Sequence, residues 1–228
     1  MKRWQIVVGA VLLVGVAVAV FGPLIYQWTS SSPDPLLERR LAEADGTVRA
    51  ADLEGRWTVD SEDSIVGYRV EERIGIGTVD AVGRTSDVTG TFEVTDGVLV
   101  SGEFVVEMAN VQSDRSQRDD QFRTRIMDVE TYPTATFVVT ESIELPAETD
   151  LADAEPFPVT GDLTVRGATQ PVEMGLVASI DDGRLRLTGE TTIVFRDWGI
   201  PNPSLPTAMI FTADSGVLEL DLYFLPAE

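Results

Sequence analysis

Hydrophobic and polar residues alternate along most of the chain after Arg56, and a period of two is typical of strands with one buried face. Val66, Tyr68 and Val70, for example, are separated by Gly67 and Arg69. Eight or nine such segments predict an all-β domain of antiparallel strands. The segments are Trp57–Asp60, Val66–Val70, Val88–Thr95, Val98–Met108, Thr134–Ser142, Phe157–Arg166, Pro171–Ile180, Arg184–Phe195 and Val217–Phe224.

Two Asp-Gly pairs mark tight turns between neighbouring strands. Asp96-Gly97 and Asp182-Gly183 have the composition of two-residue hairpin turns, in which the backbone adopts positive φ. Many short strands joined in this way indicate a sandwich or a barrel. The pattern is interrupted once, and we predict a single short helical insert at Arg115–Arg125.

Three glycines bear on the interior of the predicted barrel. Gly90, Gly102 and Gly189 fall on the inward-facing parity of long strands. Glycine there removes side chains from the interior, and about eight strands enclose just enough space for one small ligand. The glycines are equally compatible with sharp strand bends around a filled core, so the pattern leaves both a hollow and a packed barrel open.

The first 28 residues have a different pattern. Uncharged and mostly apolar residues run from Ile6 to Tyr26, about 21 residues or roughly 31 Å of helix, which matches a bilayer core. Lys2 and Arg3 precede this run, so we expect residues 1–28 to form a single transmembrane anchor with a cytoplasmic N-terminus. A signal peptide cleaved after Ala17-Val18-Ala19 is the alternative, and both readings export the rest of the chain.

The remaining chain divides into a stalk and a domain. Residues 29–55 begin with a polar, proline-containing linker, and Leu36–Ala44 has the spacing of a short helix. Residues 56–228 contain the predicted barrel. We therefore expect a single-pass protein of the cell membrane, attached to the bilayer through residues 6–26, with an extracytoplasmic C-terminal domain.

Composition excludes several classes of function. The 228 residues include no Cys and no His, so thiol catalysis, a Ser-His-Asp triad and common zinc or haem ligation are absent. The 38 acidic residues outnumber the 17 basic ones, which gives a net charge of −21 and argues against nucleic-acid binding. Close carboxylate pairs such as Asp119-Asp120 arise by chance at this density, and we predict neither catalytic residues nor metal ligands.

Six strings in the predicted domain together resemble one family. Any one of them is a weak signal, but their order and spacing agree from about Arg56 to Phe224. The strings are Trp57–Asp60 with Ser64–Arg69, Val88–Phe92, Ser113–Arg115 with Arg118-Asp119, Tyr132–Phe137, Gly161–Val172, and Phe195–Ile200 with Pro203. In these strings the chain is similar to the YceI-like family of bacterial exported lipid-binding proteins.

The resemblance implies a lipocalin-like antiparallel barrel that holds a polyisoprenoid tail, such as that of a quinone or a polyprenol, and no cofactor. It implies no catalytic residues and leaves pairing into a homodimer open. Arg166 stands where many members have His, which puts in doubt any role of that His.

Inward parity supplies candidate residues for the lining of such a cavity. Ordinary core packing is the alternative for each of them. Trp198 lies in a loop-like string and either caps the barrel mouth or packs within the loop. The other candidates are Tyr68, Phe92, Gly102, Phe104, Met108, Phe137, Leu163, Met174, Leu176, Phe195, Leu222 and Phe224.

The sequence therefore favours a membrane-anchored, extracytoplasmic binding protein for a polyisoprenoid lipid. The first alternative is a scaffold or adhesion module with a filled barrel and no ligand. A lipid hydrolase or isomerase is the third hypothesis, and the lack of a nucleophile motif makes it the weakest.

Overall fold

Eight antiparallel strands close into a barrel. The computed structural model describes residues 47–145, 147–150, 156–181 and 184–227, and within them the ring closes where the last strand pairs with the first. This confirms the predicted all-β class and the barrel. In order around the ring, the strands are β2 (Gly55–Ile74), β4 (Val88–Thr95), β5 (Val98–Glu107), β7 (Thr134–Val139), β10 (Phe157–Val165), β11 (Ala168–Asp181), β12 (Arg184–Val194) and β14 (Ser215–Pro226).

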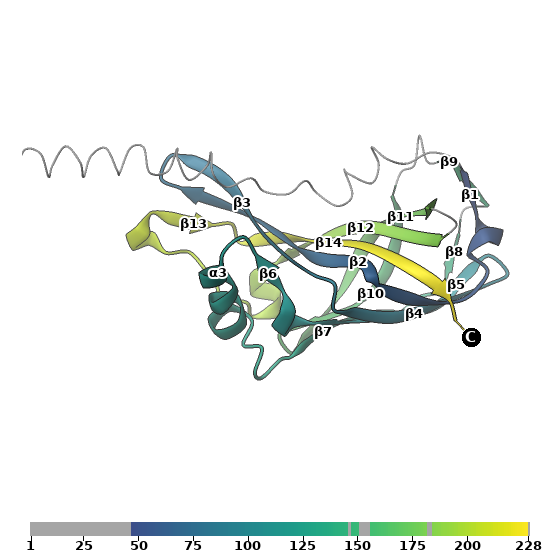
Figure 1. Ribbon diagram of the computed structural model, residues 1–228, viewed down its shortest axis with the longest axis horizontal. Helices are drawn as coiled ribbons and strands as arrows, with labels where there is room; N and C mark the ends of the chain where they lie inside the picture. Colours follow the sequence, from purple (N-terminus) through teal and green to yellow (C-terminus); the bar gives the residue numbers. More distant parts are fainter. Residues whose placement is uncertain (1–46, 146, 151–155, 182–183, 228) are drawn as a thin grey trace, which may run out of the picture.

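Strand β2 is long enough to pair with two different strands along the same edge. Residues 55–58 of β2 pair with β4, whereas residues 66–74 pair with β3 (Gly77–Thr85). The sequence pattern predicts two separate segments, Trp57–Asp60 and Val66–Val70, where the structure has the single strand β2, and it does not predict β3. Because β2 and β3 extend beyond the ring, their hairpin projects from one end of the barrel (Figure 1).

Shorter elements gather at the two ends of the barrel. The predicted helical insert is present as α3 (Ser116–Gln121) followed by η3 (Phe122–Ile126), a single π-helical turn. It lies near the β2–β3 hairpin and β13, at the end opposite the C-terminus (Figure 1). The remaining elements are β1 (Thr47–Arg49), η1 (Ala50–Leu53), η2 (Met108–Asn110), β6 (Gln112–Ser113), β8 (Ile143–Glu144), β9 (Glu148–Asp150), η5 (Phe195–Trp198), η6 (Pro206–Ala208) and β13 (Ile210–Thr212).

Aromatic side chains fill the end of the barrel near the C-terminus. Phe224 is completely buried, and its ring meets Phe92 edge-on at 4.9 Å and Phe104 edge-on at 6.2 Å between centroids. The Trp57 ring stacks on Phe92 with the ring centroids 6.3 Å apart. These contacts place the packed core of the barrel at this end.

The hairpin turn between β4 and β5 has the predicted geometry. Asp96 and Gly97 both adopt positive φ, 52° and 76°. Their backbone N–H groups donate to the carboxylate of Glu54, at 3.0 and 3.3 Å. The second predicted turn, Asp182-Gly183, lies outside the described residues.

We expect Gly97→Val to destabilise the protein by about 1 kcal/mol or more, because a β-branched residue is strained at positive φ. Thermal unfolding measures the effect. Thr95→Val, which puts the same side chain on an exposed strand position next to the turn, is the control and should leave the melting temperature unchanged. Equal melting temperatures for both variants would contradict the turn assignment.

The predicted anchor and the predicted Leu36–Ala44 helix fall within residues 1–46, outside the described residues. In the part of the chain that the structure describes, no helix has both the length and the apolar character needed to cross a bilayer.

Candidate functional site

The barrel is hollow at the end that carries α3. A cavity of about 750 Å³ occupies this half, within the range of about 300–1,000 Å³ typical of small-molecule pockets. Most of its lining side chains are aliphatic or aromatic, and most come from the barrel strands. Phe104 lines the cavity and also contacts Phe224, so the packed aromatic core forms the closed end of the cavity.

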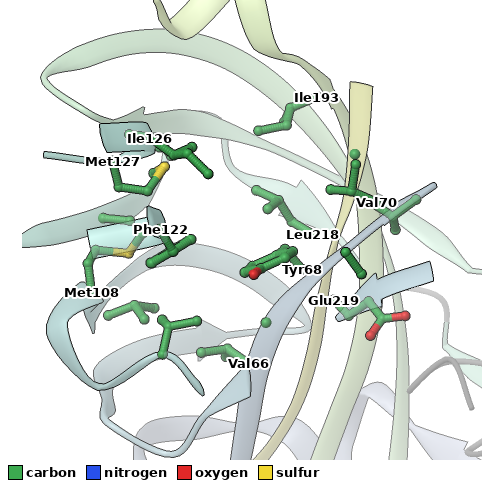
Figure 2. Close-up of a pocket in the computed structure, with 18 of the residues that line it drawn as sticks. Val66, Tyr68, Val70, Met108, Phe122, Ile126, Met127, Ile193, Leu218 and Glu219 are labelled. Carbon is green, nitrogen blue, oxygen red and sulfur yellow. The ribbon is translucent and has the colours of Figure 1, made fainter. Parts of the chain in front are cut away.

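The helical insert supplies one wall. Phe122 and Ile126 of η3, and Met127 directly after it, project into the cavity opposite strand residues such as Leu218 (Figure 2). The Phe122 ring stacks on Tyr68 with centroids 5.3 Å apart and an interplanar angle of 10°. This stacking ties the insert to β2 and holds the insert over the open half of the barrel.

Tyr68 contributes a phenol hydroxyl to the lining of the cavity. Its ring covers Gly83 on the neighbouring strand, and an added Cβ at Gly83 would overlap that ring. Within the described residues the structure gives the Tyr68 hydroxyl no hydrogen-bond partner. Burial raises the pKa of this hydroxyl above its ordinary value, because removal from water disfavours the charged phenolate.

The raised pKa has a consequence for stability at alkaline pH. In the unfolded chain the Tyr68 phenol ionises near pH 10, while the folded protein keeps the proton to higher pH. Unfolding therefore releases a proton above about pH 10, and stability should fall as pH rises through that value. We expect Tyr68→Phe to lose less unfolding free energy than the wild type over this range, measured by urea unfolding at several pH values. Parallel pH profiles would contradict the burial of this hydroxyl.

The arginines at the mouth of the cavity are paired with carboxylates. Arg118 forms an ion pair with Glu72 at 3.4 Å and another with Asp114. Arg115 pairs with Asp114 at 3.5 Å. The polar rim is therefore balanced in charge.

Glu219 contributes to the barrel wall, but its carboxylate points away from the cavity (Figure 2). It accepts hydrogen bonds from Arg69 at 3.0 Å and from Arg84 at 3.2 Å. The carboxylate is nearly fully buried by these ion pairs. Its charge is thus neutralised outside the apolar interior.

The comparison with known families identifies this fold. Residues 57–224, most of the chain, match the YceI-like domain. The chain belongs to the YceI-like domain family. Domains of this family are binding domains and are generally not catalytic. No curated protein matches the sequence.

Two solved structures are similar to this YceI-like chain. BcnA from Burkholderia cenocepacia is 20% identical, with a TM-score of 0.58, and the match covers 72% of this chain and 98% of BcnA. A polyisoprenoid binding domain from Saccharophagus degradans, implicated in plant cell wall breakdown, is 15% identical, with a TM-score of 0.55. That match covers 75% of this chain and 98% of the other. At such identities the likeness shows the fold alone.

Most of the sequence-predicted lining residues lie around the cavity of this YceI-like barrel. Their side chains lie at the cavity wall, and their contact with a ligand stays a prediction. The residues that line the cavity are Tyr68, Phe104, Met108, Phe137, Leu163, Met174, Leu176, Phe195 and Leu222.

Four predicted residues do not line it. Phe92 and Phe224 have inward parity but belong to the packed aromatic end. Gly102 lies beside them, since a Cβ there would approach Val139, Phe104 and Phe92. Trp198 is buried in η5, and its indole N–H donates to the carbonyl of Leu163 at 3.2 Å, so it packs within its loop and does not cap the mouth.

The parity pattern missed the wall formed by the helical insert. Phe122 and Ile126 stand four residues apart in an otherwise charged segment, and Met127 follows Ile126 directly. A spacing of four places Phe122 and Ile126 on one helical face, which is the signal that could have identified this wall. Among the described residues there is also no cluster of three or more carboxylates arranged to hold a metal ion.

Proposed function

We propose that this YceI-like domain binds one polyisoprenoid lipid, with the tail in the cavity and the head group at the mouth beside α3. The observation that carries the proposal is the apolar cavity of about 750 Å³, closed at one end by Phe104 and Phe224 and open at the other. A blind apolar channel fits a long hydrocarbon tail, because every methyl-bearing unit of the tail leaves water.

The fold comparison supports this ligand class. The Saccharophagus degradans protein is described as a polyisoprenoid binding domain. The fold match covers 98% of that protein and 75% of this chain. A fold alone does not determine function. The cavity in this chain supplies the independent observation.

The polar groups at the mouth favour an uncharged head group of the quinone or polyprenol type. Arg115 and Arg118 already pair with Asp114 and Glu72, so a phosphate there would compete with existing ion pairs. The Tyr68 hydroxyl can donate a hydrogen bond to a quinone carbonyl or accept one from a polyprenol.

Selective rebinding tests the ligand class. Delipidated full-length protein is incubated with an isoprenoid quinone, a polyprenol, a polyprenyl phosphate or a straight-chain fatty acid, and bound lipid is quantified after gel filtration. We expect the quinone or the polyprenol to bind best, and Tyr68→Phe to weaken head-group selectivity. Equal uptake of the fatty acid, or none of any lipid, would refute the proposal.

The cavity also bears on the alternatives. A filled barrel would contain no apolar void of this size, and an empty void lowers the free energy of unfolding. Lipid binding accounts for the void, because the lipid tail would fill it.

We further propose that residues 1–28 anchor the protein in the cell membrane and that the barrel lies outside the cytoplasm. The support is the apolar run from Ile6 to Tyr26, which is preceded by two basic residues. Protease added to intact spheroplasts should then digest the barrel and leave a short membrane-bound stub. A barrel that resists protease until the membrane is broken would contradict this topology.

A further inference from the structure

The open end of the barrel carries an exposed apolar surface. Its side chains are Ile76, which is 84% exposed, Met209 at 51%, Phe211 at 41% and Leu205 at 37%. We call these four residues the apolar tip. The other large apolar side chains exposed by the described residues, Val100, Val138, Ile180 and Leu225, are spread over four different strands of the barrel.

Two segments distant in sequence build the apolar tip as one unit. The β2–β3 turn and the loop before β13 lie side by side at the same end of the barrel (Figure 1). The backbone N–H of Gly75 donates to the carbonyl of Met209 at 3.1 Å. Next to this bond, Ile74 pairs with Ile210 across β2 and β13. These pairings hold the two turns together.

The apolar tip is continuous with the cavity. Leu205 belongs to the apolar tip and also lines the cavity, as do Ile74 and Ile210, which pair with each other beside the tip. Apolar side chains thus link the apolar tip to the interior of the barrel. A hydrocarbon tail could move along this surface without crossing water.

The distribution of charge indicates which kind of partner can approach the apolar tip. Residues 198–213 contain no charged side chain, nor do residues 74–79, in a chain with 24% charged residues and a net charge of −21. The adjoining helical segment, residues 114–125, has four Arg and three Asp. These segments of the open end carry less negative charge than the remainder of the chain, so an anionic membrane repels them less.

The geometry points to a lipid bilayer as the partner of the apolar tip. We propose that Ile76, Leu205, Met209 and Phe211 insert into the membrane interface and dock the cavity mouth there, so that lipid passes directly between the bilayer and the cavity. Arg73, whose guanidinium lies 5.2 Å from the centre of the Phe211 ring, suits the head-group level, where arginine and aromatic side chains concentrate. This inference rests on the proposed function, because docking serves the exchange of lipid, but the experiment that tests docking does not depend on lipid binding.

Site-specific fluorescence quenching tests the docking. Because the chain has no cysteine, Ile76→Cys, Met209→Cys and Val100→Cys each give a single labelling site in the full-length protein. Val100 is the matched control: it is 43% exposed and lies near the start of β5, whose far end leads to Met108 in the cavity. The labelled proteins are reconstituted into vesicles of phosphatidylethanolamine and phosphatidylglycerol that contain brominated phospholipid and no polyisoprenoid.

We expect brominated lipid to quench the labels at 76 and 209 several-fold more than the label at 100, and aqueous iodide to give the reverse order. Ile76→Glu should abolish lipid quenching of a label at 209, while Val100→Glu should not. Iodide-accessible, unquenched labels at 76 and 209 would overturn the proposal. So would labels shielded from both quenchers, because that result assigns the surface to a second copy of the chain. Since the vesicles lack polyisoprenoid, failure here leaves the binding proposal intact.

Discussion

Ala135→Phe should abolish lipid binding and leave the barrel folded. Ala135 lies on β7 with its side chain in the cavity, opposite Val106, which also lines the cavity. A phenyl ring at this position projects into the space assigned to the tail. We expect ligand affinity to fall tenfold or more, at least about 1.4 kcal/mol.

The same substitution distinguishes a hollow barrel from a filled one. A packed interior would be overfilled by the added ring and would lose about 1–3 kcal/mol of stability. A cavity accepts the ring, so the melting temperature should stay close to that of the wild type.

Val138→Phe is the matched control for Ala135→Phe. Val138 lies on the same strand, but its side chain points outward and is 39% exposed. It should retain both lipid and stability. Loss of lipid in both variants, or in neither, would contradict the assignment of the cavity.

Phe224→Ala should be among the most destabilising single changes in the domain. Phe224 is 0% exposed and packs edge-on against Phe92 and Phe104. Truncating a fully buried phenylalanine costs about 3–5 kcal/mol, and its aromatic contacts are lost as well. In a domain of this size the melting temperature should fall by roughly 10 °C or more.

Phe104→Ala is the informative comparison with Phe224→Ala. Phe104 borders the cavity on one side, so its removal enlarges a space that already exists. We expect a smaller loss of unfolding free energy than for Phe224→Ala. An equal loss would mean that the interior around Phe104 is as densely packed as the aromatic end.

Strand periodicity predicted the barrel because the fold depends on which side chains face inward. Parity does not report how far along the barrel axis a residue lies. Phe104 and Phe224 both face inward, yet one lines the cavity and the other is sealed in the aromatic end. That difference depends on strand stagger and on tertiary packing, which a single strand does not encode.

The glycines illustrate a second limit. Gly90 and Gly189 have inward parity, as the sequence indicated, but neither opens the cavity. Side chains from the paired strands, Phe104 over Gly90 and Leu176 over Gly189, occupy the positions a Cβ would take. The hollow half is instead lined both by the α3–η3 wall and by strand residues with short side chains such as Ala135 and Val106. Residues distant in the sequence create that space.

Mass spectrometry of the organic extract of purified full-length protein tests the central claim most directly. The protein is purified without added lipid, and Ala135→Phe is extracted in parallel as the control. We predict a polyisoprenoid lipid of the quinone or polyprenol type in the wild-type extract, at close to one molecule per chain, and its loss from the variant. A wild-type extract that contains no lipid, or only straight-chain acyl lipid at the same level as the variant, would contradict polyisoprenoid binding.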